Sequence, residues 1–129
     1  MKKMLVMLKR KSGMSQEAFR HHYENVHAAL GAQYFDGLLT DFHRYYPTAL
    51  TPFPADWRHL SPHMTTTPDY DAIAVYTFRD EAALQEYFRK MHDPEIGDVL
   101  RTDEERFLDR AACRVGFCDA AAGDGIAAH

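Results

Sequence analysis

Hydrophobic runs alternate with segments of helical period along the first part of this chain. Residues 4–8 are apolar throughout and are followed by Lys9-Arg10-Lys11, which is typical of a strand covered on both faces. Ser15 is a good N-cap for the next segment. Apolar and aromatic residues recur there at helical spacing, at Phe19, Tyr23, Val26 and Leu30. The pattern predicts a strand followed by an amphipathic helix.

The rest of the chain predicts two strands separated by a long loop, then two helices and a last strand. Residues 41–46 and 70–78 have the aromatic and β-branched content of strands. Asp80 and Asp93 are predicted N-caps of two further helices, the second running to about Asp109, and residues 110–118 form a last predicted strand. The predicted inward positions of these helices are Leu84, Tyr87, Phe88, Met91, Ile96, Leu100 and Phe107. The order β-α-β-β-α-β predicts an α+β, ferredoxin-like fold.

The long loop is a proline-rich stretch over residues 47–69 that has no sustained period. Loops of this length often cover a binding site, and we expect this one to close over a cavity as a lid that carries Trp57. We expect one domain over residues 1–118 and a flexible tail over residues 119–129, which is rich in Ala and Gly.

The third predicted strand is apolar on both faces. Its side chains alternate between Ile73 and Val75 on one face and Ala72, Ala74, Tyr76 and Phe78 on the other. Helices cover only one face of a ferredoxin-like sheet, and an apolar open face is not tolerated in water. A second copy stacked sheet to sheet would bury it, so we expect a homodimer with two-fold symmetry.

The composition and charge of the chain argue against some classes of partner and location. The chain has 129 residues, 46% apolar, with 15 basic and 19 acidic side chains and a net charge of −4. No basic face suggests nucleic acid as a partner. The apolar run near the N-terminus is too short for a signal peptide or membrane span, so the cytoplasm is the expected location. Cys113 and Cys118 fall on one predicted strand, on opposite faces, and we expect unpaired thiols.

Two ionisable residues are candidates for catalysis. His27, one turn after Tyr23, could transfer a proton near pH 7, or it could simply bond to carbonyls at the helix end. Asp103 lies on the apolar stripe of the last helix, where a buried carboxylate needs a partner. Arg44 and His27 are the plausible partners, and a purely structural ion pair is the alternative role.

Aromatic residues could form the wall of a substrate site. On the second strand His43 and Tyr45 point one way and Arg44 the other. Together with Tyr23, Trp57 and Tyr76, they would suit a flat ring and hydrogen-bond its oxygens. An aromatic core without a ligand is the alternative.

Metal and cofactor sites lack a convincing motif. His59 and His63 have the spacing of helical metal ligands, but Pro62 lies between them and argues against a helix. No Gly-rich phosphate loop or dinucleotide fingerprint is present. We therefore expect neither a metal nor a cofactor.

These motifs together carry a family resemblance. Residues 9–20 combine a basic turn with Ser15 and Phe19, residues 22–30 read His-Tyr-Glu-Asn-Val-His-Ala-Ala-Leu, and Asp93-Pro94-Glu95-Ile96 and residues 103–109 follow later. Across residues 1–118, apart from the long loop, the chain resembles EthD-domain proteins of the dimeric α+β barrel superfamily. Ala29 stands where that family commonly has proline, which would allow the helix to continue to Leu30.

The resemblance implies a class of chemistry and no single reaction. The superfamily includes cofactor-free oxygenases, decarboxylases, isomerases and polyketide cyclases. We expect a cofactor-free acid/base enzyme acting on a small aromatic or polyketide-like molecule, with His27 and Asp103 as its catalytic residues. A non-catalytic small-ligand-binding or accessory protein is the alternative, and haem or metal binding ranks behind both.

Overall fold

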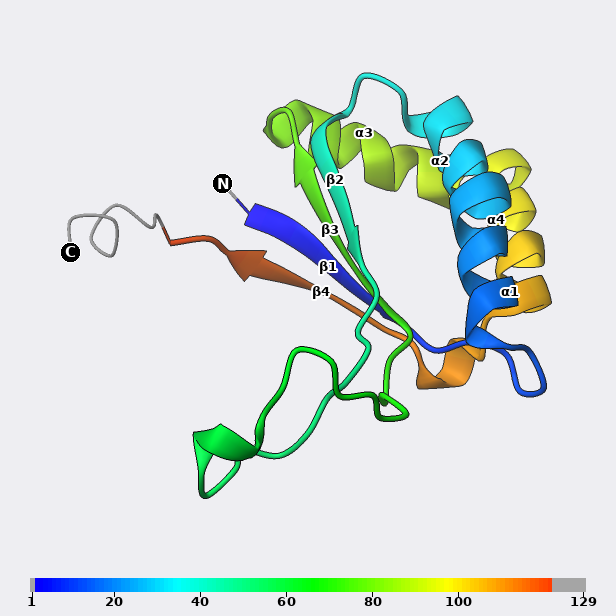
Figure 1. Cartoon of the computed structure of the whole chain (residues 1–129). Coiled ribbons are helices and arrows are strands. Elements are labelled where there is room, and N and C mark those ends of the chain that lie inside the picture. Colours follow the sequence, from blue (N-terminus) through cyan, green and yellow to red (C-terminus); the bar gives the residue numbers. More distant parts are fainter. Residues whose placement is uncertain (1, 122–129) are drawn as a thin grey trace.

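The computed structural model describes residues 2–121 and consists of one sheet with a layer of helices against it (Figure 1). The strands are β1 (Lys2–Leu8), β2 (Leu39–Tyr45), β3 (Ala72–Phe78) and β4 (Arg114–Asp119). The helices are α1 (Gln16–His22), the π-helical segment η1 (Tyr23–His27), α2 (Ala28–Phe35), α3 (Glu81–His92) and α4 (Pro94–Phe107), with short 3-10 turns η2 (Trp57–His59) and η3 (Arg110–Ala112).

The sheet has four strands in the order β2-β3-β1-β4, and every neighbouring pair is antiparallel. Val6 lies at the centre, opposite Ala74 of β3 and Val115 of β4. The two strands that follow helices, β2 and β4, are the edges. This arrangement confirms the ferredoxin-like α+β fold that the order of elements predicted.

The first helix is continuous: α1, η1 and α2 follow one another without a break. The Ser15 hydroxyl accepts a hydrogen bond from the Ala18 amide at 3.0 Å, which confirms the predicted N-cap. The π-helical turn places His27 on the inner side after Tyr23, while Val26 is 38% exposed. The prediction of Val26 as an inward residue was wrong, because a π turn holds more residues than the α period assumes. The helix also continues past Leu30 to Phe35.

The second helical pair begins at the predicted caps. The Asp80 and Asp93 carboxylates accept hydrogen bonds from the amides of Ala83 and Glu95. The turn between α3 and α4 is tight, since a Cβ on Gly97 would lie 2.6 Å from the Met91 carbonyl oxygen. Glycine at this position therefore lets the two helices approach, and their apolar faces reach the sheet.

The C-terminal strand is shorter than predicted. The first residues of the predicted span, Arg110–Ala112, form η3, and Cys113 follows it ahead of β4. The Cys113 sulfur accepts a hydrogen bond from the Lys9 amide at 3.3 Å, so this residue is fixed outside the strand. Cys113 and Cys118 are both free thiols, as predicted, although they do not share a strand.

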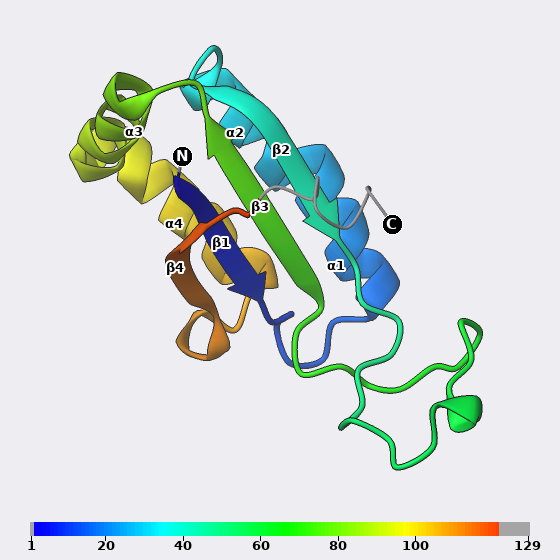
Figure 2. The same cartoon turned by 90° about the vertical axis from the view of Figure 1, so that its left-hand side faces the viewer.

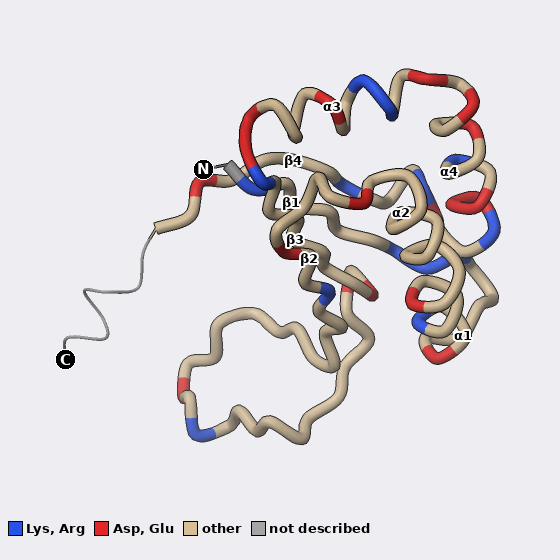
Figure 3. The backbone as a smooth tube through the Cα atoms, turned by 90° about the horizontal axis from the view of Figure 1, so that it is seen from above, with Lys and Arg blue, Asp and Glu red and all other residues tan. Residues whose placement is uncertain are grey.

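One face of the sheet is covered by helices and the other is open (Figures 1 and 2). The strand register places on the open face Leu5 and Met7 of β1, His43 and Tyr45 of β2, and Ile73 and Val75 of β3. Many of the charged residues belong to the helices (Figure 3). The middle of the open face is therefore apolar and aromatic.

The loop over residues 47–69 extends away from the helical layer (Figure 1). Phe53 and Trp57 pack edge to face at its tip with their ring centroids 5.4 Å apart, and they are 88% and 61% exposed. The loop contributes no residue to the cavity described below, so within one protomer the predicted lid is wrong. Most of the predicted tail, residues 122–129, lies outside the described residues.

The open face gives the homodimer prediction a specific test. Ile73→Asp should leave the protomer folded but give monomers or aggregates, because sheet-to-sheet stacking would desolvate an unpaired carboxylate. Light scattering should give twice the 14.8 kDa chain mass for the unmodified protein. Val99→Asp, on the outer side of α4 where Val99 is 39% exposed, is the matched control and should stay dimeric. A monomeric unmodified protein at micromolar concentration would disprove the dimer.

Candidate functional site

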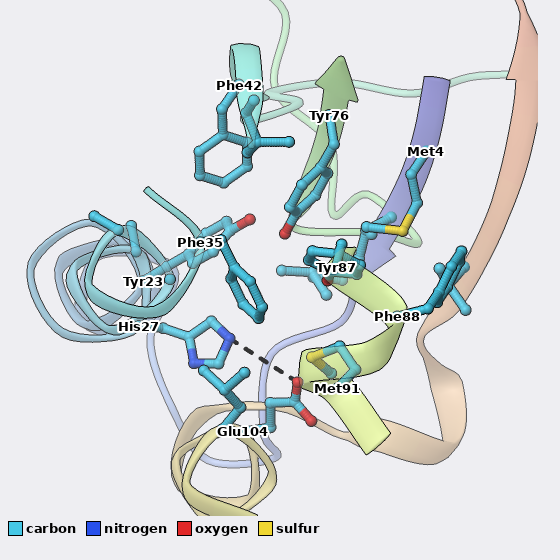
Figure 4. A pocket seen from close by; sticks show the side chains of 18 of the residues that line it. Met4, Tyr23, His27, Phe35, Phe42, Tyr76, Tyr87, Phe88, Met91 and Glu104 are labelled. Carbon is cyan, nitrogen blue, oxygen red and sulfur yellow. Dashed lines mark ion pairs between the residues drawn. The ribbon is translucent and has the colours of Figure 1, made fainter. Parts of the chain in front are cut away.

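A cavity of about 510 Å³ lies between the sheet and the helices. Its walls are mostly apolar and aromatic, and Figure 4 shows His27 and Glu104 as a polar pair among them. The sheet contributes residues such as Met4, Phe42 and Tyr76, and α3 contributes Tyr87 and Phe88. A cavity with few polar groups among apolar walls is typical of sites for small organic molecules.

Small residues of α2 make room for the cavity. Ala28, Gly31 and Ala32 line it at helical spacing. A Cβ placed on Gly31 would meet nothing within 4 Å, so the space beside this helix is empty. Larger side chains at these positions would project into that space.

Asp103 is a buried charge that lies behind His27 at the cavity wall. It is only 1% exposed, in the middle of the apolar face of α4. Its Oδ2 lies 2.9 Å from Nδ1 of His27, and its Oδ1 lies 2.9 Å from Nε2 of His22. Arg106 reaches Oδ1 more distantly, at 3.4 Å. The predicted partner His27 is therefore correct, and His22 is a second partner that the sequence did not indicate.

The hydrogen bonds from the two histidines keep the Asp103 carboxyl ionised. Burial by itself would raise the pKa of Asp103, but the hydrogen bonds from His27 and His22 outweigh it and lower the pKa below its usual value. An ionised carboxylate can only accept hydrogen bonds, so Nδ1 of His27 and Nε2 of His22 carry the protons. In neutral His27 the lone pair is then on Nε2.

Nε2 of His27 is the nitrogen that remains available for chemistry. His27 lines the cavity, and its side chain is 16% exposed. Nε2 lies 3.9 Å from Oε2 of Glu104, which also lines the cavity (Figure 4). Arg110 donates to the other oxygen of Glu104 at 3.1 Å and holds that carboxylate in place. A proton taken up at Nε2 would therefore lie between two carboxylates, Asp103 and Glu104.

Two of the phenols that line the cavity, Tyr23 and Tyr76, lie close together, and the Tyr23 ring centroid is 6.2 Å from that of His27. The hydroxyl groups of Tyr23 and Tyr76 point toward one another (Figure 4). The buried Tyr23 oxygen makes no well-formed hydrogen bond among the described residues, although the Tyr76 hydroxyl interacts with it. Burial raises the pKa of both tyrosines, so both remain protonated and can donate. A buried donor without a well-formed hydrogen bond at a cavity wall suits an oxygen atom of a ligand.

The π-helical segment is also tied to the sheet. Glu24 accepts hydrogen bonds from the Arg44 guanidinium and, at 2.7 Å, from the Tyr46 hydroxyl. Arg44 is therefore the partner of Glu24, and the prediction that it could pair with Asp103 was wrong. The segment is held by β2 on one side and by α4 on the other, which fixes the direction of His27.

The structure brings together only part of the predicted site. Tyr23, His27 and Tyr76 line the cavity, with Asp103 behind His27. His43 and Tyr45 lie on the open face of the sheet, and Trp57 lies in the long loop. Their predicted role as substrate walls therefore has no support from the cavity of one protomer. Sequence reasoning missed His22 and Glu104, whose only sequence signal is their nearness to His27 and Asp103.

Between residues 2 and 121 no group of three His, Cys, Asp or Glu side chains is arranged to hold a metal ion. No helix in that range is long and apolar enough to cross a membrane.

Replacing Asp103 tests the charge network. Asp103→Asn should lower the free energy of unfolding at pH 7 by about 2 kcal/mol, because the amide cannot accept from both imidazoles and leaves a donor unpaired. Because folding lowers the carboxyl pKa, the wild-type advantage is present above the unfolded value of about 3.9 and is lost as the pH falls through the folded pKa. Urea unfolding at pH 7 and in acid measures both effects.

The matched control is Asp98→Asn on the same helix. Asp98 pairs with Arg101 at the surface, where its side chain is 61% exposed. This change should alter the stability by less than about 0.5 kcal/mol. Equal losses for both variants would show that the burial of Asp103 carries no special stability.

Replacing Gly31 tests the cavity as a binding site, with 2-naphthol as a flat phenolic probe. Gly31→Ala should bind the probe like the wild type and gain up to about 1 kcal/mol of stability from helix propensity. Gly31→Leu should fold but lose at least about tenfold in affinity, since its side chain would fill the empty space. Fluorescence titration gives the affinities. Unchanged binding by the leucine variant would place the probe elsewhere.

Comparison with known proteins supports the fold and names relatives. A dehydratase named aurZ from Gibberella zeae is 27% identical over 122 residues, which cover 90% of this chain and 76% of that protein. A conidial pigment biosynthesis dehydratase EthD from Metarhizium robertsii is 27% identical over 114 residues, which cover 84% and 75%.

Solved structures show the same fold. An EthD family protein from Bacillus halodurans matches with a TM-score of 0.59 at 18% identity and covers 94% of this chain and 99% of its own. A dimeric protein with a ferredoxin-like fold from Bacteroides fragilis matches with a TM-score of 0.52 at 9% identity, covering 92% and 95%. The EthD domain model matches residues 11–111. The chain belongs to the EthD domain family.

Proposed function

We propose that this protein is an enzyme that eliminates water from a small cyclic β-hydroxy ketone, aromatic or polyketide-like, by acid/base chemistry without a cofactor. The observation that carries the proposal is the His27–Asp103 pair, whose other imidazole nitrogen, Nε2, lies beside Glu104 at the wall of a largely apolar cavity. The two relatives named dehydratases favour elimination of water over decarboxylation, cyclisation, isomerisation or oxygenation.

The first step is removal of a proton from the carbon next to the ketone. Nε2 of His27 takes the proton, and the electron pair of the C–H bond moves toward the ketone oxygen. The hydroxyls of Tyr23 and Tyr76 donate hydrogen bonds to that oxygen as its negative charge develops. Asp103 and Glu104 stabilise the imidazolium that forms on His27.

The second step expels the hydroxyl group. The enolate electrons return to form the C=C bond, the C–O bond at the β carbon breaks, and the imidazolium gives its proton to the departing oxygen. One water leaves, and His27 is neutral again, so no external oxidant or reductant is required. The apolar walls limit access of bulk water and strengthen the hydrogen bonds to the enolate.

The walls favour a flat substrate with oxygens at one end. Rings of Phe42, Tyr76 and Tyr87 line the cavity beside the aliphatic side chains. His27 and Glu104 supply polar groups to one part of the wall, and Tyr23 and Tyr76 supply two hydroxyls. Such a cavity suits a cyclic molecule whose hydroxy-ketone portion meets His27 and whose hydrocarbon portion lies between the aromatic walls.

We propose a cytoplasmic homodimer as the working form. The apolar open face of the sheet and the dimeric structural neighbour from Bacteroides fragilis support the dimer. The free thiols Cys113 and Cys118 support a reducing compartment.

The central experiment uses 3-hydroxy-1-tetralone as a probe, because loss of water from it gives 1-naphthol, which is followed by fluorescence. His27→Ala should lower turnover by roughly two to four orders of magnitude, the usual contribution of general acid/base catalysis. Exchange of the proton next to the ketone in heavy water, followed by NMR, should fall in parallel. His92→Ala, on the exposed end of α3, is the control and should keep full activity.

The alternative of a non-catalytic binding protein gives a different result. In that case the probe binds saturably, no 1-naphthol forms, and the exchange rate does not exceed the rate in buffer. A His27→Ala variant that is destabilised but retains full activity per folded molecule would instead make His27 a structural residue. Either outcome would overturn the proposed role of His27.

A further inference from the structure

His22 is the part of the buried network that the proposed reaction does not use. Its Nε2 donates to Oδ1 of Asp103 at 2.9 Å, the same distance as the bond from His27 to Oδ2. Its ring packs on Phe107 with the centroids 4.6 Å apart. Its side chain is 21% exposed and is absent from the cavity wall. His22 therefore cannot touch a substrate in the cavity and can act only through Asp103.

A carboxylate that accepts one hydrogen bond on each oxygen is held more firmly than a carboxylate that accepts a single hydrogen bond. His22 and His27 belong to the same continuous helix, at the ends of α1 and η1, so their positions are fixed relative to each other. With one donor on each oxygen, the Asp103 carboxylate cannot rotate about its own bond without losing a hydrogen bond. Each lost bond to a charged, buried group is costly.

Arg106 competes with His22 for Oδ1 of Asp103. Arg106, one turn further along α4, reaches Oδ1 at 3.4 Å with a side chain that is 65% exposed. Without His22, the carboxylate could turn toward this guanidinium and away from Nδ1 of His27. A histidine ring in water favours the proton on Nε2, so a weakened Asp103 contact would let the proton leave Nδ1.

We propose that His22 is a positioning residue, which fixes the Asp103 carboxylate so that His27 keeps its proton on Nδ1 and its lone pair on Nε2 toward the cavity. The functional part of this inference rests on the proposed role of His27 as the base. The groups that face His27 from the surrounding elements are Tyr23 on its own helix, Asp103 and Glu104 on α4, and Tyr76 on β3. None of these can replace the second contact on Oδ1.

The test measures the tautomer of His27 directly in the substrate-free dimer or protomer, whichever the protein forms. Long-range proton–nitrogen NMR of histidine-labelled protein at pH 8 should show the proton of His27 on Nδ1 in the wild type. In His22→Leu, which keeps an apolar contact with Phe107, His27 should become a mixture of both tautomers. In His22→Gln, whose amide can still donate to Oδ1, the wild-type tautomer should return.

The matched control is His21→Leu, the same change one residue earlier. His21 is exposed and contacts Asn25, so this variant should leave the His27 tautomer unchanged. With the tetralone probe, His22→Leu should lower kcat by about tenfold to a hundredfold with little change in KM, and His22→Gln should recover most of it. A merely structural role would lower the melting temperature of His22→Leu without moving the tautomer.

Two results would overturn the proposal. One is a wild-type tautomer in His22→Leu, and the other is a mixed tautomer in His22→Gln. If the leucine variant does not fold, the glutamine variant alone decides. Because the tautomer is read without substrate, the test stays informative even if His27→Ala shows that the proposed dehydration is wrong.

Discussion

A single buried carboxylate organises the helical layer of this protein. Asp103 is 1% exposed, and a charge in that position is tolerated only if its oxygens are fully paired. The two donors come from residues 76 and 81 positions earlier in the chain. Pairing therefore requires α4 to lie against the end of α1 and the π-helical segment. The contact that makes the burial possible is also the contact that orients His27, so stability and the proposed chemistry depend on the same hydrogen bonds.

The π-helical segment is the local feature that makes this pairing possible. His22 and His27 are five residues apart, a spacing that a regular α-helix turns to different sides. The wider π turn brings both rings to one carboxylate, and such segments are often found at functional sites. The hydrogen bonds of Arg44 and Tyr46 to Glu24 hold the same segment from the sheet side. It is thus fixed between β2 and α4.

The cavity beside α2 is space that close packing of the core would have filled. A layer built only for stability would fill the space beside α2, where Gly31 has no neighbour within 4 Å of its missing Cβ. The chain leaves this space open and lines it with aromatic rings, including three phenols, Tyr23, Tyr76 and Tyr87, whose burial raises their pKa and keeps them protonated. Among the described residues the buried Tyr23 hydroxyl has only the Tyr76 hydroxyl to interact with, and an oxygen of a bound molecule would give it a further partner. The open volume and the weakly paired phenols are both suited to binding a ligand.

The sequence by itself determined the order of elements, the caps at Ser15, Asp80 and Asp93, and the unusual place of Asp103, because periodicity and capping are local properties of the backbone. It also indicated His27 as a partner of Asp103. Only the tertiary structure decided that His22 is the second partner, that Arg44 pairs with Glu24, and that His43, Tyr45 and Trp57 lie away from the cavity. These outcomes depend on how distant helices and strands pack, on which sheet face the helices cover, and on a π turn that changes the helical register. No spacing along the chain encodes that geometry.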